Sequence, residues 1–349
     1  MSSTNAKHNW WILRIGRFSY KLDKRVLPVF LVLLVLGIVI LVTSVSYGAY
    51  DITPIEVINT ILGLETNERF QLVVWQFRLP RILISFIIGG ALSVSGAILQ
   101  GITRNPLADP GILGVTSGAS FAAVASIVWF QTPATYLPFV TFAGASIMAA
   151  LIYLLAWKGG SSSFRLILVG IGLAAITGAV TNIMIVFGDI QQVQQAYVWL
   201  AGSVYGRDWG HVRSITPWLL ILLPMAILQA RQLNTLSLGD DTAKGLGVNV
   251  EWQRGLLLLI SVALASISVA VSGTVGFVGL VAPHITRRLV GPAHEGLIPA
   301  SALLGGVLVM FADLVSRFVI APSELPVGIV TAMIGAPYFA YLLYKTRNQ

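Results

Sequence analysis

The stretch RLPR at residues 78–81, the glycine-rich apolar run after it and the turn NPLADPG at residues 105–111 decide how this chain folds. Two arginines stand at the beginning of the apolar run, and two prolines stop it at the other end. About 20 consecutive apolar residues cross the hydrocarbon core of a bilayer as one helix. Because ten runs of this kind follow one another along the chain, the sequence predicts an all-α, polytopic membrane protein built around a path.

The composition is not that of a soluble protein. The chain has 349 residues, of which 56% are hydrophobic and 10% charged, whereas an ordinary globular domain has about 25% charged residues. A soluble domain of this length must cover its surface with polar side chains. The chain has no cysteine, which excludes disulfides and thiolate metal sites. The net charge of +8 comes from dispersed basic residues, so we expect no nucleic acid among its partners.

Apolar runs bounded by charges, Pro and Gly predict ten spans, at residues 26–49, 79–101, 111–130, 136–157, 164–188, 214–232, 252–272, 275–290, 296–320 and 325–345. They form one transmembrane domain over residues 26–345, which follows an N-terminal arm at residues 1–25. The run at 275–290 is short and rich in glycine, and losing it would reverse the orientation of everything after it.

Basic residues are unevenly divided between the two sides of the predicted membrane. With the N-terminus inside, 16 of the 22 Lys and Arg residues lie on the cytoplasmic side. Lys and Arg favour the cytoplasmic loops of membrane proteins. We therefore expect a multi-pass protein of the cell membrane with both termini in the cytoplasm.

Helix signals also occur outside the ten spans. In residues 51–70, the stretch TPIE at residues 53–56 has the spacing of a capping box and a proline at the first helical position, which predicts a short surface helix. Residues 190–206 mix glutamines with Tyr and Trp, which indicates an amphipathic stretch that is too polar to span the membrane and lies near its outer interface. At the third span, Asp109 and Pro110 predict an N-cap and a first helical residue.

The inner loop at residues 233–251 is polar and contains GDDTAKGLG at residues 239–247. Asp240 or Asp241 is suited to cap a short helix, and the glycines at its end suit a left-handed turn. A short helix held between two spans would give a cytoplasmic partner a rigid contact. A solvated loop without a partner is the alternative interpretation.

Three arginines, Arg78, Arg81 and Arg317, fall at the outer face under this topology. An arginine costs about 2.5–3.5 kcal/mol at the membrane centre and much less at the edge, so side chains that merely anchor the helices are one explanation. However, Asp313 stands one helical turn before Arg317 and can pair with it, and Glu324 is near in the sequence. These carboxylates favour an organised polar corner.

Several functional classes lack their usual residues. The sequence contains no GxxxxGK[ST] loop, so the chain has no P-loop with which to hydrolyse ATP. Acidic residues are almost absent from the spans, which disfavours a secondary transporter driven by an ion gradient. The four dispersed histidines and the lack of HExxH or GxSxG disfavour an enzyme embedded in the membrane.

Five stretches of the sequence resemble the membrane permease subunits of the ABC importers for ferric siderophores, haem and vitamin B12. They are RLPR at 78–81, SGAILQGITRNPLADPGILGVTSGA at 95–119, LGDDTAKGLGV at 238–248, SGTVGFVGLVAPHITR at 272–287 and ADLVSRFVIAPSELPVGIVTAMIGAPYF at 312–339. They extend from the second span to the last, and the longest are ungapped.

The resemblance implies a non-catalytic permease subunit of an ATP-binding-cassette importer that translocates an iron–siderophore chelate. Members of the family have ten helices and work in pairs, so a second permease subunit, identical or paralogous, is expected. Two copies of a separate ATPase, which uses ATP and Mg, and an extracellular substrate-binding protein complete the transporter. This chain is expected to bind no cofactor and no metal. Haem or cobalamin is the alternative cargo.

The resemblance also assigns roles to individual residues. Carboxylates of the binding protein are expected to meet Arg78, Arg81 and Arg317. The inner gate corresponds to Ser162, Ser163 and Phe164, where the phenylalanine departs from the small polar residue expected. The loop between the sixth and seventh spans contacts the ATPase. Its coupling residues are Gly239, Asp240, Asp241, Thr242, Ala243, Lys244, Gly245, Leu246 and Gly247.

Overall fold

The structure is a computed structural model that describes residues 10–15, 18–48, 50–65, 67–111, 114–157, 163–320 and 323–346. The first half contains β1 (Trp10–Ile15), β2 (Phe18–Asp23), α1 (Val26–Ser46), α2 (Pro54–Ile61), α3 (Glu68–Gln71), the π-helical η1 (Leu72–Arg78), α4 (Leu79–Thr103), α5 (Val115–Val124), the π-helical η2 (Ala125–Trp129), the short η3 (Ala134–Tyr136), α6 (Leu137–Ala156) and α7 (Ser163–Val186). The second half contains α8 (Ile190–Leu200), α9 (Trp209–Leu228), α10 (Ala230–Ser237), α11 (Asp240–Gly245), α12 (Val250–Ser272), α13 (Val278–Val290), α14 (His294–Phe318) and α15 (Val327–Thr346).

The all-α membrane fold predicted from the sequence is confirmed, because a helix lies at each of the ten predicted spans. Eight helices of the described chain are long and apolar enough to cross a membrane. The helix formed by α5 and η2 is shorter, and α13 has 13 residues. At 1.5 Å per residue α13 is about 20 Å long, less than the ~30 Å hydrocarbon core. As a helix, the run predicted at 275–290 is therefore shorter than the hydrocarbon core.

Helix α4 is the centre of the bundle. The apolar window of its helical segment is 83% buried within the chain, whereas that of α1 is 11% buried. Glycines allow α4 to lie close to its neighbours. An added Cβ on Gly96 would lie only 1.8 Å from the carbonyl oxygen of Gly279 in α13, and an added Cβ on Gly89 would lie 2.2 Å from the carbonyl oxygen of Gly305 in α14. Small residues let helix backbones approach closely where lipid provides no hydrophobic drive between helices.

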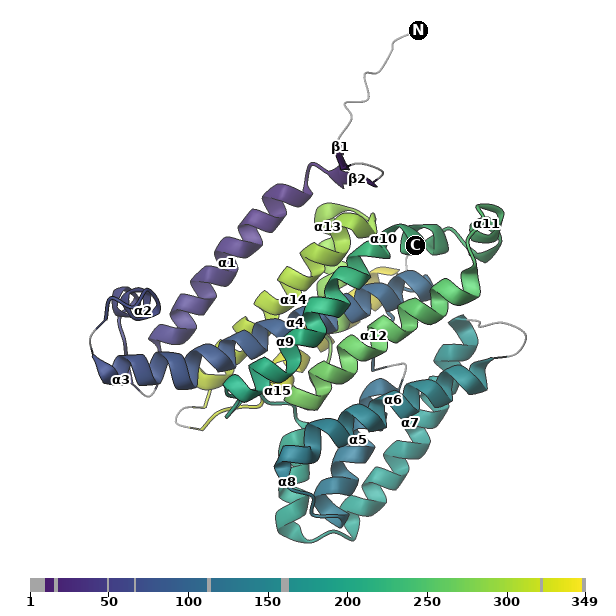
Figure 1. Cartoon of the computed structure of the whole chain (residues 1–349). Helices are drawn as coiled ribbons and strands as arrows, with labels where there is room; N and C mark the ends of the chain where they lie inside the picture. The colour runs from purple at the N-terminus through teal and green to yellow at the C-terminus, as the bar shows by residue number, and fades with distance from the viewer. Residues whose placement is uncertain are drawn as a thin grey trace.

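The two ends of α4 define two ends of the molecule (Figure 1). At one end Arg104, directly after α4, reaches Asp240 at the start of α11; we call this the α11 end. At the other end α4 continues from α3 and η1; we call this the α3 end. The hairpin of β1 and β2 precedes α1 near the α11 end, and α2 lies at the α3 end (Figure 1).

The segments outside the spans agree with the sequence analysis except at one turn and one hairpin. Thr53 caps α2 in a capping box with Glu56, and the amphipathic stretch at residues 190–206 contains the helix α8. The N-cap predicted at Asp109 is wrong: its carboxylate accepts a hydrogen bond from the amide of Gly111 at 2.8 Å, which forms a local turn, and α5 begins at Val115. The antiparallel pair of β1 and β2, within the N-terminal arm, was not predicted.

Replacing Gly96 with alanine is expected to lower the thermal stability of the detergent-solubilised protein. The added methyl group overlaps the backbone of Gly279, and overpacking of this kind costs at least ~1–3 kcal/mol. The matched control is Gly172→Ala in α7, where an added Cβ would meet nothing within 4 Å; it is expected to stabilise by about 0.5–1 kcal/mol. Equal unfolding midpoints of the two variants would contradict the close contact of α4 with α13.

Candidate functional site

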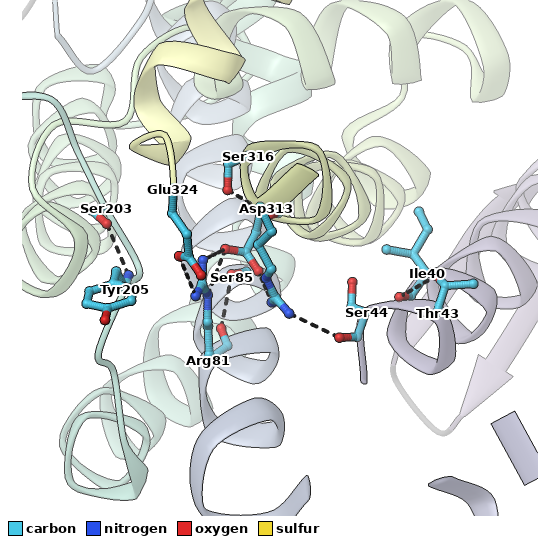
Figure 2. Close-up of polar contacts among 11 residues, drawn as sticks. Ile40, Thr43, Ser44, Arg81, Ser85, Ser203, Tyr205, Asp313, Ser316 and Glu324 are labelled. Atoms are coloured by element: carbon cyan, nitrogen blue, oxygen red, sulfur yellow. Dashed lines mark hydrogen bonds and ion pairs between the residues drawn. The ribbon is translucent and has the colours of Figure 1, made fainter. Parts of the chain in front are cut away.

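Arg81 joins three parts of the chain at the α3 end. It lies in the first turn of α4, and its Nε and Nη2 donate to Oδ1 of Asp313 in α14 at 2.9 and 2.8 Å. Its Nη1 lies 2.8 Å from Oε2 of Glu324, in the loop before α15. Figure 2 shows both carboxylates turned toward this guanidinium. The fork of donors on arginine suits such a double contact.

Asp313 is shared by two arginines. Its other oxygen accepts from Nη2 of Arg317, so the pairing predicted from the i, i+4 spacing is confirmed. Arg317 also donates to the carbonyl of Ser44 at 3.0 Å, which ties α14 to the end of α1. Because the side chain of Asp313 is only 1% exposed, its charge is buried, and a buried charge is tolerated only when it is paired.

The side chain of Arg78 is buried and bonded within the chain. The docking role predicted for it requires an exposed arginine. Arg78 is 8% exposed and donates to the carbonyls of Val45, Ser46 and Tyr50. Two of these carbonyls belong to the last turn of α1, where backbone acceptors lack partners within the helix and the helix dipole favours a cation. Arg78 therefore holds the end of α1 against α4.

The arginine cluster consists of Arg78, Arg81, Asp313, Arg317 and Glu324. The cluster contains three guanidinium groups and two carboxylates, and Arg78 contacts backbone carbonyls rather than either carboxylate. Arg81 and Arg317 keep 11% and 9% of their side chains exposed, and Glu324 keeps 29%. The guanidinium carbon of Arg81 also lies 5.7 Å from the ring centroid of Tyr205, within the range of a cation–π contact. Glu324 is thus the most accessible charged partner in the cluster.

The short helix predicted within residues 239–247 is confirmed, as α11 (Asp240–Gly245). The cap differs from the prediction: Gly239, with φ of 111°, precedes the helix, and Asp240 is its first residue rather than its N-cap. Both oxygens of Asp240 accept from Nη2 of Arg254 at 2.8 Å. Gly247 has φ of 81°, as expected for a left-handed turn after the helix.

We call residues 239–247 the α11 segment. Most of its other residues are exposed. Ala243 is completely buried and anchors the helix. Leu246, in contrast, is 64% exposed, and Asp241, Thr242 and Lys244 are exposed beside it. Acidic residues in the first turn and Lys244 in the last match the helix dipole. This segment presents a small, rigid surface with both polar and apolar groups.

The residues predicted as an inner gate lie at the junction of α6 and α7. Ser162 is outside the described residues, and Ser163 is the first residue of α7. Phe164 is 73% exposed. The preceding helix α6 reaches the start of α12, because an added Cβ on Gly255 would lie 3.5 Å from the hydroxyl of Tyr153. This end of α6 therefore lies at the α11 end.

A third polar feature, which the sequence analysis did not assign, is an open hollow of about 440 Å³ between α5 and α7. We call it the hydroxyl hollow, and its polar lining is Thr116, Ser117, Ser120, Thr181, Asn182 and Thr274. All six side chains are neutral. Ser120 lies four residues after Thr116 and three after Ser117, a spacing that places it beside both on the helix surface and could have signalled the hollow. Among the described residues, no group of three His, Cys, Asp or Glu side chains could hold a metal ion.

Comparisons with known proteins agree with this geometry. The model of the FecCD transport family matches residues 33–345. The chain is 46% identical to the iron(3+)-hydroxamate import system permease protein FhuG of Bacillus subtilis (strain 168), over 91% of this chain and 97% of that protein. It is 43% identical to the achromobactin transport system permease protein CbrC of Dickeya dadantii (strain 3937), over 97% of each. It is 39% identical to the hemin transport system permease protein HmuU of Yersinia pestis, over 96% of this chain and 98% of that protein.

The fold also has a counterpart among solved structures. A metal-chelate type ABC transporter in an inward-facing conformation superposes with a TM-score of 0.83 at 33% identity, covering 91% of this chain and 99% of that one. Sequence and structure thus match over nearly the whole length. The chain therefore belongs to the FecCD transport family, as the non-catalytic membrane permease subunit of an ABC importer.

Proposed function

We propose that this chain is the permease through which an iron(III)–siderophore chelate crosses the cell membrane. The observation that carries the proposal is the set of relatives at 43–46% identity, whose names specify iron(3+)-hydroxamate, a siderophore, achromobactin and iron(3+)-citrate. The hemin permease is 39% identical, which is within the range of the iron-chelate permeases that match at 38–46%. Haem therefore remains the second candidate cargo.

The hydroxyl hollow is the part of this chain suited to line the path. A bulky chelate must be released again, so its path should bind it weakly, and neutral hydroxyl and amide groups do this. On the same face of α7, an added Cβ on Gly178 would meet nothing within 4 Å. We place a second permease subunit opposite this face, so that two such hollows enclose the path.

The exposed residues of the α11 segment are the contact for the ATPase in this proposal. The chain has no P-loop, so a separate subunit must hydrolyse ATP. Two ATPase subunits that use ATP and Mg would each contact one permease through α11, on the cytoplasmic side, where both termini then also lie. Phe164, at the same end, is the candidate for the inner gate, together with Ser162 and Ser163.

The arginine cluster is the docking site for an extracellular binding protein in this proposal. Arg81 and Arg317 are the residues that remain partly accessible, and Arg78 serves to position α1. An incoming carboxylate takes the place of Glu324 on Arg81, since Glu324 is the most exposed partner there. Charge-assisted contacts of this kind orient partners and allow them to separate again.

The cargo is tested by uptake into proteoliposomes that contain the permease pair, the ATPase and the binding protein. Radiolabelled iron should accumulate as a ferric hydroxamate or ferric citrate complex in an ATP-dependent way, while haem and cobalamin should not accumulate. Liposomes loaded with ADP are the control. Uptake of haem in preference to every iron chelate would identify the second candidate cargo instead.

Docking is tested by two substitutions with opposite expected effects. Arg81→Gln should weaken binding of the binding protein about tenfold or more, because a hydrogen bond to a charged group contributes ~1.5–3 kcal/mol. Glu324→Gln should strengthen binding, because it removes the internal competitor for Arg81. Affinity is measured in nanodiscs, with Arg69→Gln, an exposed arginine of α3, as the matched control. An unchanged affinity in Arg81→Gln would exclude Arg81 as the docking residue.

The ATPase contact is tested by Leu246→Asp, which puts a charge on the exposed apolar group of the α11 segment. The variant should fold, because Leu246 is 64% exposed, but the ATPase should no longer co-purify with it. Arg231→Ala, an exposed residue of α10 at the same end, should retain the ATPase. If Leu246→Asp binds the ATPase normally, the α11 segment is not the contact.

A further inference from the structure

A second polar pocket, of about 390 Å³, lies at the α3 end. Its walls come from α8, from the segment between η2 and α6, and from the loop that joins α8 to α9. We call it the Arg207 pocket, and its polar lining includes Gln192, Gln195, Ser203, Tyr205, Arg207 and Ser272. Its volume lies within the range of about 300–1,000 Å³ that is usual for small-molecule sites.

The Arg207 pocket adjoins both the arginine cluster and the hydroxyl hollow. The ring centroid of Tyr205 lies 5.7 Å from the guanidinium carbon of Arg81 (Figure 2). On the other side, the amide of Ser203 donates to the carbonyl of Ser272 at 2.7 Å, and Thr274, two residues further on, lines the hydroxyl hollow. In the proposed function, a chelate released at the arginine cluster therefore meets this pocket before it reaches the hollow.

The charge of the pocket comes from Arg207, which is the only charged residue among its described lining. No carboxylate oxygen of the described residues lies within 4.0 Å of this guanidinium. Its Nη1 lies 3.4 Å from Nε2 of His211, whereas the carboxylate of Asp208 contacts the other ring nitrogen of that histidine at 2.7 Å. Burial lowers the pKa of Arg207, and the charge of Asp208 offsets this only in part.

The guanidinium of Arg207 has donors to offer. Its Nε is buried and has no hydrogen-bond partner within the described chain, and a guanidinium carries five N–H donors in all. Burying a charge is costly unless the charge is paired, and a carboxylate accepts two parallel hydrogen bonds from arginine. In the same wall, Oε1 of Gln192 is a buried acceptor without a described partner, which a hydroxyl group can satisfy. The pocket thus suits a hydroxycarboxylate.

Iron(III) chelates differ in the property that such a pocket recognises. Three singly charged hydroxamates neutralise iron(III), so a trihydroxamate chelate has no net charge. A citrate chelate, in contrast, is anionic and presents carboxylates at its surface. Specificity is a difference between two affinities, and a contact with Arg207 raises the affinity for the anionic chelate alone.

We propose that the Arg207 pocket is an entry site that binds a carboxylate of an anionic iron(III) chelate and favours such chelates over neutral ones. The proposal rests on the proposed function and narrows its cargo to carboxylate-bearing chelates. One charged contact in an open pocket binds weakly, so the chelate can move on into the path.

The test measures weak binding of chelates to the complex of permease pair and ATPase in nanodiscs, by saturation-transfer NMR. The probes are gallium(III) citrate and a neutral gallium(III) trihydroxamate, in which the diamagnetic metal replaces iron(III) at the same charge. The unmodified complex should bind the citrate chelate more tightly. Arg207→Gln should weaken its binding about tenfold or more, the effect of losing one hydrogen bond to a charged group, and leave trihydroxamate binding unchanged. Arg207→Lys should retain part of the preference, because it keeps the charge.

Two further variants separate the pocket from general effects of charge and folding. Gln195→Glu places a carboxylate at an exposed position of the pocket wall and should repel the citrate chelate while Arg207 stays in place. The matched control is Arg213→Gln, which removes an exposed arginine of α9 outside the pocket lining. It should bind both chelates as the unmodified complex does.

Several results would overturn the inference. They are equal binding of the two chelates by the unmodified complex, unchanged citrate binding in Arg207→Gln or Gln195→Glu, and an equal loss in Arg213→Gln. Weaker attachment of the binding protein to Arg207→Gln with citrate binding intact would assign Arg207 to docking instead. The proposed function fails separately, if the unmodified transporter accumulates no iron chelate in proteoliposomes.

Discussion

Close backbone contact between α4 and its neighbours is the constraint on which the rest of the structure depends. Lipid tails are as apolar as the side chains they touch, so helices in a membrane associate through packing and hydrogen bonds. Gly96 against Gly279 and Gly89 against Gly305 leave no room for a side chain. Between these contacts, the hydroxyl groups of Ser95 and Ser261 meet at 2.8 Å. α4 is thus fixed along its length. The arginine cluster and the α11 segment lie at its two ends and are positioned by it.

Ion pairs then determine what each end of α4 can do. At the α3 end, Asp313 is enclosed by Arg81 and Arg317, while the more accessible Glu324 completes the coordination of Arg81. At the α11 end, Asp240 is enclosed by Arg254 and Arg104. In both places a carboxylate held by two arginines joins elements that are distant in the sequence. Such pairs fix the relative positions of the helices more than they raise the free energy of unfolding, because desolvation offsets much of their attraction.

Local patterns led to correct predictions where the interacting residues are close in the sequence. The capping box of Thr53 and Glu56, the pairing of Asp313 with Arg317 and the short helix α11 all follow from spacings of a few residues. The cap of that helix and the start of α5 were predicted wrongly, because an aspartate can also accept hydrogen bonds from a local turn or from distant arginines. Neither competitor is visible in a short window of sequence.

The sequence by itself determined that the chain lies in a membrane, where its helices fall and which residues carry charge, because hydropathy and helix periodicity are properties of single segments. Only the tertiary structure decided which groups each charged side chain contacts. Arg78 became a buried cap on α1, Asp240 turned inward to α12, and hydroxyl groups of α5 and α7 gathered into one hollow. The physical reason is that burial and pairing depend on which helices pack together, and that packing is set by contacts between residues far apart along the chain.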